Sequence, residues 1–275
     1  MSQEPGRAGR NLPAAVAVGL GLGALILTTL YLYKPAFLAV VVLAIGIGMY
    51  ELTRALGSKG LHPPMIPLVL GSAAILCTAY FEGRDWMTTA MLLTIPAVLA
   101  FRVWRGVDGI VADLLSALLA LLYVGFLAGF CGLLLAPNDG DRRATCFVAT
   151  VVASDVGGYA IGAMFGKHLL APKISPKKSV EGLAGSIAMC SLIGWLLCTT
   201  LLHTYWWQGV LLGLTLVTTA TLGDLGESMV KRDLGIKDMG NLLPGHGGLL
   251  DRLDSLLPSA PAAWALLAAF VSPHS

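Results

Sequence analysis

The chain has 275 residues, of which 56% are hydrophobic and only 12% are charged, and its mean hydropathy is +0.77. This composition excludes an ordinary soluble domain and indicates a polytopic membrane protein. The net charge of +2 is too small to indicate nucleic-acid binding, so the lipid bilayer is the first predicted partner.

Apolar stretches of about 20 residues, the length needed to cross a bilayer, recur along the whole chain. Because the loops between them are short, we expect an all-α fold that forms a single membrane domain over residues 1–275. Residues 1–137 supply helices with few reactive groups and no assigned role, and residues 144–271 supply the helices and loops that carry the chemistry. The stretches predict about nine membrane-spanning helices, near residues 13–33, 35–56, 64–81, 86–104, 110–136, 144–166, 182–203, 206–230 and 248–271.

Lysine and arginine are unevenly distributed between the two sides that this topology defines. One side carries Lys34, Arg84, Arg142 and Arg143, and the opposite side carries the rest of the 18 basic residues. Because cytoplasmic loops are enriched in lysine and arginine, the N-terminus is predicted to be cytoplasmic. We therefore expect a multi-pass protein of the plasma (inner) membrane with its active site at the cytoplasmic face.

The first half of the chain contains few groups that could carry chemistry. Glu51 and Asp113 lie near cytoplasmic helix ends, where charged side chains reach the interface at low cost. We interpret them as structural partners of Arg54 and Arg105. The small-residue stretch Val16–Ala24 permits close helix packing, and with it a homodimer.

The predicted helix 144–166 carries a carboxylate well inside an apolar span. Asp155 lies about 16 Å from the cytoplasmic end at a rise of 1.5 Å per residue. One alternative is a neutral carboxyl group that is hydrogen-bonded to a neighbouring helix. Because intramembrane carboxylates are commonly functional and the adjacent glycines permit close helix approach, we favour a pocket-lining role.

A basic loop follows between Phe165 and Gly182, with four lysines and two prolines. Lys177 and Lys178 supply point charges, while Ser175 and Ser179 supply hydroxyl donors. The helix that follows offers free N–H groups at its start. These features suit phosphate binding, although a loop of this kind could equally be a topological signal.

The most highly charged stretch runs from residue 223 to 255, and its side chains recur at helical offsets. Asp224, Glu227 and Lys231 lie at helical offsets i, i+3 and i+7. Asp251 and Asp254 repeat the i, i+3 spacing, so the two pairs of carboxylates can face each other. Carboxylate oxygens are typical ligands of divalent cations.

The loop between the two acidic pairs carries Arg232 and Lys237 and ends at His246, Gly247 and Gly248. Glycines let backbone N–H groups approach an anion without a Cβ in the way. Carboxylates for a divalent cation, together with cations and bare amides for phosphates, indicate a metal-nucleotide site.

One long pattern in this stretch resembles the signature of the phosphatidate cytidylyltransferase family: Ser228-x-x-Lys231-Arg232-x4-Lys237-Asp238-x5-Pro244-x-His246-Gly247-Gly248-x2-Asp251-Arg252-x-Asp254. The segments from Ser154 to Tyr159 and from Ile174 to Gly182 resemble a second landmark of the same family. The resemblance implies transfer of a cytidylyl group from CTP to phosphatidic acid with Mg²⁺. The products would be CDP-diacylglycerol, an intermediate of phospholipid biosynthesis, and pyrophosphate.

The resemblance also implies a role for each matching side chain. Mg²⁺ would be held by Asp224 and Asp251, with Asp254 and Glu227 as further ligands or close neighbours. The side chains expected to act in catalysis are Asp224, Asp251, Lys178 and Lys231. Those expected to bind substrate are Asp155, Ser175, Lys177, Ser179, Ser228, Arg232, Lys237, His246, Gly247, Gly248 and Arg252.

Two other functions fit parts of the pattern. A CTP-dependent lipid kinase would use the same nucleotide and the same metal. A cation-coupled transporter would bind an ion at the acidic helix ends. No inverted repeat of hydropathy is apparent, and the basic loops suit phosphate better than cation passage, so the transporter fits less well.

Overall fold

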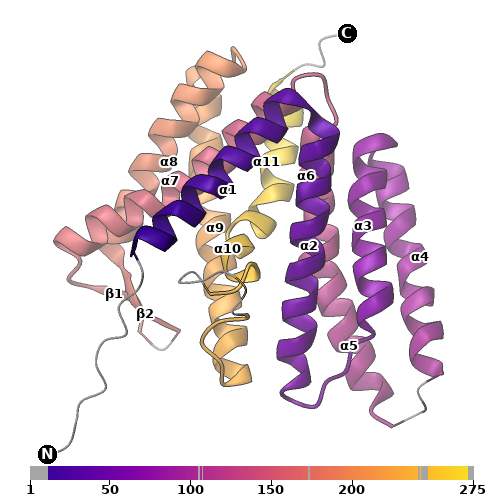
Figure 1. Ribbon diagram of the computed structural model, residues 1–275. Helices are drawn as coiled ribbons and strands as arrows, with labels where there is room; N and C mark the ends of the chain where they lie inside the picture. Colours follow the sequence, from indigo (N-terminus) through magenta and orange to yellow (C-terminus); the bar gives the residue numbers. More distant parts are fainter. Residues whose placement is uncertain are drawn as a thin grey trace, which may run out of the picture.

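The computed structural model describes residues 12–104, 106, 108–172, 174–240, 242 and 247–271, with the backbone alone at residues 12–20, 22, 176 and 177. The described chain is a bundle of helices with one short β-hairpin (Figure 1). Its elements are α1 (Leu12–Leu32), α2 (Lys34–Gly57), α3 (Met65–Phe81), α4 (Arg84–Val103), α5 (Ile110–Ala120), the π-helix η1 (Leu121–Phe126), α6 (Leu127–Leu135), α7 (Gly140–Phe165), β1 (Leu169–Ala171), β2 (Ser175–Ser179), α8 (Val180–Leu201), α9 (Trp206–Leu234), α10 (Leu250–Leu253) and α11 (Leu256–Phe270).

The nine predicted apolar stretches all coincide with helical segments, which confirms the membrane class of the fold. Seven segments of the described chain are long and apolar enough to cross a membrane, by length and composition. Helix α3 has 17 residues, and the fully described apolar part of α1 is Gly23–Leu32, so both are shorter. The predicted count of nine spans is therefore approximate.

Two of the predicted helices are interrupted. The stretch 110–136 forms α5, η1 and α6 in continuous succession, with a π-helical segment in the middle. The stretch 248–271 forms the short α10 and then α11, and the chain turns at Asp254 and Ser255 between them. Both interruptions lie where polar side chains of the candidate site are found.

Successive spans of the bundle run in opposite directions, with α5, η1 and α6 together forming one span (Figure 1). Basic residues gather at one end of the bundle. Helices α2, α4 and α9 finish at this end, and their last turns carry Arg54, Arg102 and Lys231. We call it the basic end. At the other end, Lys34 at the start of α2 donates from Nζ to the carbonyl oxygen of Pro137, at 2.6 Å.

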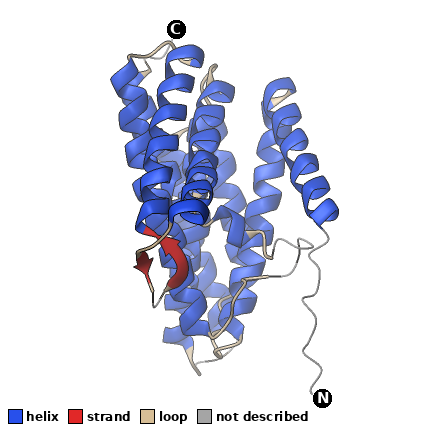
Figure 2. Cartoon of the chain, turned by 90° about the vertical axis from the view of Figure 1, so that its left-hand side faces the viewer, coloured by secondary structure: helices blue, strands red, loops and turns tan. Residues whose placement is uncertain are grey.

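The predicted basic loop between α7 and α8 is in part a hairpin. Strands β1 and β2 pair antiparallel, with Leu169 opposite Ser179 and Ala171 opposite Ser175. Figure 2 shows the two strands of this hairpin in red. The hairpin brings the end of β2 directly to the start of α8.

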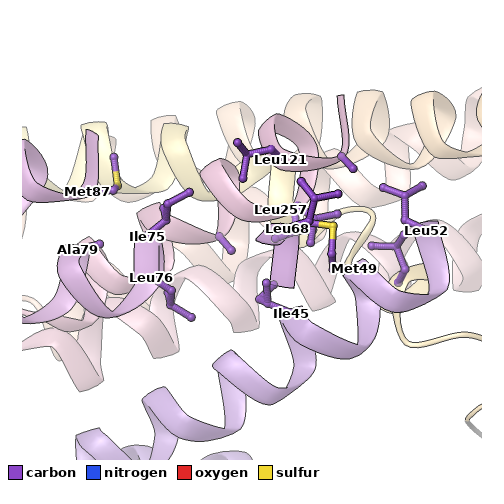
Figure 3. Close-up of a cluster of buried hydrophobic side chains, with 14 of the residues drawn as sticks. Ile45, Met49, Leu52, Leu68, Ile75, Leu76, Ala79, Met87, Leu121 and Leu257 are labelled. Atoms are coloured by element: carbon purple, nitrogen blue, oxygen red, sulfur yellow. The ribbon is translucent and has the colours of Figure 1, made fainter. Parts of the chain in front are cut away.

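A buried apolar cluster joins the N-terminal helices to the last helix. Met49 of α2, Leu68 and Ile75 of α3, and Leu121 of η1 are at most 1% exposed. Leu257 of α11 belongs to the same cluster and is 2% exposed (Figure 3). The first half of the chain is therefore packed against the element that follows the acidic residues.

Helices α7, α8 and α9 approach each other through glycines. A Cβ on Gly157 would collide with the backbone carbonyl of Gly185, and a Cβ on Gly194 would collide with that of Gly209. Small residues let helix backbones pack closely in membranes. This close packing aligns the three helices whose ends form the candidate site.

The charges of the first half have other partners than those predicted. Asp113 accepts from Arg102 Nε at 2.8 Å and from the backbone N–H of His62 at 2.6 Å. Arg105, its predicted partner, lies outside the described residues. Glu51 does not pair with Arg54 but accepts backbone N–H groups near α10, and the Arg54 guanidinium donates to the Tyr50 hydroxyl at 3.3 Å instead.

Candidate active site

Helix α9 carries four polar side chains on one face near its C-terminal end. Asp224, Glu227, Ser228 and Lys231 lie at helical offsets i, i+3, i+4 and i+7. The helix ends at Gly235, whose φ of 71° is the left-handed conformation that commonly terminates helices. A rigid helix thus presents this stripe at the basic end.

Lys231 joins the two acidic segments. Its Nζ lies 2.8 Å from Asp251 Oδ1 and 3.2 Å from Glu227 Oε1, and its side chain is only 13% exposed. The carboxylates that were expected to face each other therefore share one ammonium group. In this position Lys231 neutralises buried acidic groups.

Asp251 also fixes the loop that precedes it. Its Oδ2 accepts the N–H groups of Met239 and Gly248, both at 2.9 Å. The amide of Gly248, predicted to bind phosphate, thus donates inside the protein. Gly247 takes a φ of 81°, a conformation that L side chains rarely adopt, so glycine is required there.

Lys178 forms an ion pair with Asp224 at the end of β2. Both side chains remain partly accessible. The next residue, Ser179, caps α8: its Oγ accepts the N–H of Gly182 at 3.0 Å. The phosphate-binding role predicted for Ser179 is consequently limited to the hydroxyl proton that it can still donate.

A cavity of about 320 Å³ opens beside this ion pair, between α7, α8 and α9. Asp155 is an exposed side chain on its wall, as predicted, and Lys178 and Ser179 line it as well. Gly158 and Gly182 add polar backbone without bulk. The cavity therefore combines a carboxylate, an ammonium group and the start of a helix, groups that suit an anionic ligand with a bound cation.

Asp224 is the accessible carboxylate of the α9 stripe, and Asp254 lies on the turn beside it. A Cβ on Gly223 would collide with the carbonyl of Asp254, so α9 lies directly against this turn. The Asp224 side chain is 25% exposed, whereas Glu227 is 1% exposed and bound to Lys231. Among the described residues, no three His, Cys, Asp or Glu side chains form a ready metal cluster. The donor set nevertheless fits Mg²⁺ in kind, because Mg²⁺ prefers carboxylate oxygens.

The remaining predicted residues are more dispersed. Ser228 Oγ lies 3.4 Å from Asp224 Oδ1 and so belongs to the site. Arg232 donates from Nε to the carbonyl of Ile174 in the hairpin turn, at 3.5 Å, and Lys237 is exposed on the loop after α9. Four others are placed as follows: Ser175 begins β2, Arg252 is exposed on α10, and His246 and the side chain of Lys177 lie outside the described residues.

Sequence reasoning missed Tyr123, which lies in the π-helix η1. Its hydroxyl donates to Glu227 Oε2 at 3.4 Å, so a residue of the first half contacts the acidic stripe. π-Helical segments often occur at functional sites. The sequence gives no pattern for such a segment, and a tyrosine in an apolar helix resembles any core aromatic residue.

Residues 13–270 match the profile of the cytidylyltransferase family. A phosphatidate cytidylyltransferase of Mycobacterium leprae is 42% identical over 281 residues, covering 95% of this chain and 89% of that protein. The protein of the same name in Mycobacterium tuberculosis is 40% identical over 278 residues, covering 96% and 84%. A third, from Synechocystis, is 32% identical over 284 residues, covering 93% and 94%. The family resemblance of the signature is thus confirmed along nearly the whole length, and the chain belongs to the cytidylyltransferase family.

Proposed function

We propose that this protein is a phosphatidate cytidylyltransferase, which transfers a cytidylyl group from CTP to phosphatidic acid and so serves phospholipid biosynthesis. A phosphate oxygen of phosphatidic acid forms a bond to the α-phosphorus of CTP, and the bond from that phosphorus to the β-phosphate oxygen breaks. The products are CDP-diacylglycerol and pyrophosphate. The observation that carries this proposal is the pairing of Lys178 with Asp224 beside the cavity, in a chain whose relatives bear this name.

The acceptor phosphate is already an anion at neutral pH, so the reaction needs no strong general base. The protein's task is to align two polyanions and to offset their repulsion. Lys178 serves this purpose at the cavity, and Arg232 and Arg252 extend positive charge at the exposed edge of the site. Lys231 keeps Glu227 and Asp251 neutralised and in register.

We further propose that Mg²⁺ takes part, held by Asp224 and Asp251 with Asp254 nearby. When bound, Mg²⁺ would stabilise the negative charge that develops on the pyrophosphate leaving group. Lys178, which pairs with Asp224 beside the cavity, would contact the substrate phosphates. Glu227 is assigned to holding Lys231 because it is 1% exposed.

The site belongs at the cytoplasmic face of the plasma membrane in this proposal. The acyl chains of phosphatidic acid stay within the bilayer, while CTP arrives from the aqueous phase. Basic loops mark the cytoplasmic side of membrane proteins. The candidate site lies near the basic end, where both substrates can reach it.

The decisive experiment follows the phosphates of CTP with purified protein in detergent, phosphatidic acid and Mg²⁺. We expect label from the α-phosphate to enter the lipid and label from the γ-phosphate to leave as pyrophosphate. Label from the γ-phosphate in the lipid would instead identify a kinase. Failure of both labels to enter the lipid would overturn the proposal and favour the cation-coupled transporter.

A further inference from the structure

Glu51 lies on α2, in the N-terminal half, yet its carboxylate reaches the segment that leads into α10. Oε1 accepts the N–H of Leu249 at 3.1 Å, and Oε2 accepts the N–H of Leu250 at 2.8 Å. Glu51 is only 4% exposed. Both donors come immediately before Asp251, so a side chain far away in sequence holds the backbone that presents this carboxylate.

The fit around Glu51 leaves no room for side chains. A Cβ on Gly240 would overlap the Glu51 carboxylate, and a Cβ on Gly248 would overlap the carboxylates of both Glu51 and Asp251. A Cβ on Gly48, less than one turn earlier on α2, would only reach ordinary van der Waals contact with the Leu250 side chain. The two carboxylates therefore crowd the same position beside Gly248, and Asp251 also accepts the N–H of this glycine.

A buried carboxylate in a membrane protein is expensive unless its oxygens are satisfied. The hydrogen bonds found for Glu51 within the described residues come from backbone N–H groups of one segment. If Glu51 served only to bury charge, any donor would suffice. The arrangement instead ties α2 to the segment that places Asp251 against Lys231.

We propose that Glu51 is a positioning residue of the active site. It holds residues 248–251 so that Asp251 and Lys231 stay in register with Asp224. The expected effect of Glu51 on catalysis rests on the proposed function. The contact between Glu51 and residues 249–250 is independent of that function.

The isosteric change Glu51→Gln tests the idea. Glutamine has one acceptor oxygen, and its amide NH₂ would face the second backbone N–H, so one hydrogen bond is lost and two donors oppose each other. Changes to groups that orient a metal ligand typically cost about 10- to 100-fold in activity or metal affinity. We expect a loss of that size in kcat together with a higher Mg²⁺ requirement, and little change in the KM for CTP.

A second pair of variants removes the contact from the other side. Leu249 has a φ of −72°, which proline can adopt, so Leu249→Pro deletes its N–H with little backbone change. Leu249→Ala keeps the N–H and controls for loss of the side chain. We expect Leu249→Pro to resemble Glu51→Gln, and the double variant to be less impaired than the product of the two single effects, since both weaken the same contact between Glu51 and residues 249–250.

Asp113→Asn is the matched control for neutralising a buried carboxylate of the first half. It breaks the pair with Arg102, so it should lower thermal stability while leaving the Mg²⁺ requirement of the folded protein unchanged. A purely structural role for Glu51 would give that same result. An unchanged Mg²⁺ requirement in Glu51→Gln would therefore overturn the inference.

Amide hydrogen exchange gives a readout that needs no turnover. Glu51→Gln should speed exchange in the peptide spanning residues 248–251 and leave α8 as in the wild type. Equal exchange in wild type and variant would also overturn the inference. If Glu51→Gln does not fold, Leu249→Pro against Leu249→Ala decides the same question. If the wild type makes no CDP-diacylglycerol, the proposed function fails, and exchange together with thermal stabilisation by Mg²⁺ and CTP still tests Glu51.

Discussion

The N-terminal and C-terminal halves both carry charged side chains in apolar helices, but they hold them differently. In the first half, Arg102 and Asp113 have side chains that are 5% and 7% exposed and are bound to each other. In the second half, Lys178 and Asp224 are also paired, yet their side chains are 30% and 25% exposed and lie beside a cavity. An ion pair that is closed off from solvent maintains the fold. In a pair that is open to a cavity, each side chain can exchange its partner for a ligand.

The largest expected effect comes from removing the two carboxylates that are proposed to hold Mg²⁺. Asp224→Asn and Asp251→Asn should each lower kcat about 1,000-fold or more, because bound metal supplies several kcal/mol of charge stabilisation in the transition state. Formation of CDP-diacylglycerol across a Mg²⁺ titration measures this. The buried carboxylate of the first half supplies the control, since Asp113→Asn should keep its activity per folded molecule. Wild-type activity in either site variant would remove that residue from the metal site.

The next-largest effect is expected at Lys178, and it distinguishes this lysine from Lys237. Lys178→Gln should lower kcat/KM for CTP about 100-fold, because hydrogen bonds between charged groups are the strong ones and Lys178 lines the cavity. Lys237, predicted from the signature to bind substrate, is exposed on the loop after α9, and Lys237→Gln should have a much smaller effect. Equal losses in the two variants would mean that the loop closes over the nucleotide.

The sequence predicted the membrane class, the helix positions and most of the acidic stripe, for physical reasons that act locally. Apolar length specifies a span, and the spacing of Asp224, Glu227 and Lys231 specifies a shared helix face. The family signature added the assignment of chemistry. The interruptions at η1 and after α10 were not predictable, because they depend on packing between helices.

The contacts of Glu51 and Tyr123 were missed for a related reason. Each bridges the two halves of the chain, and the sequence carries no sign of which backbone N–H or carboxylate will stand opposite. Glu51 did carry one signal, an acidic residue in an apolar helix, but it was interpreted as a helix-end charge near Arg54. The partner became evident only when α2 was seen to pack against α10.

A smaller effect is expected at Asp155, which faces the cavity without belonging to the acidic stripe. Asp155→Asn keeps the shape of the side chain and removes its charge. We expect about a tenfold loss in kcat with unchanged thermal stability, as for loss of one charge interaction near a surface. Retained activity in a stable Asn variant would assign Asp155 a structural role and leave the metal to the carboxylates of α9 and α10.

The smallest effect is expected at Tyr123, where the first half makes its other contact with the acidic stripe. The hydroxyl lies 3.4 Å from Glu227 Oε2, a long hydrogen bond, and Glu227 keeps Lys231 as a closer partner at 3.2 Å. Tyr123→Phe should therefore lower kcat only about fivefold, in line with a net hydrogen-bond contribution of about 1 kcal/mol. Tyr80→Phe, on α3, is the matched control and should leave kcat unchanged. A loss in Tyr123→Phe as large as that in Glu51→Gln would mean that η1 positions the acidic stripe as strongly as α2 positions residues 248–251. An unchanged kcat would leave Glu51 as the connection through which the N-terminal helices act on the chemistry.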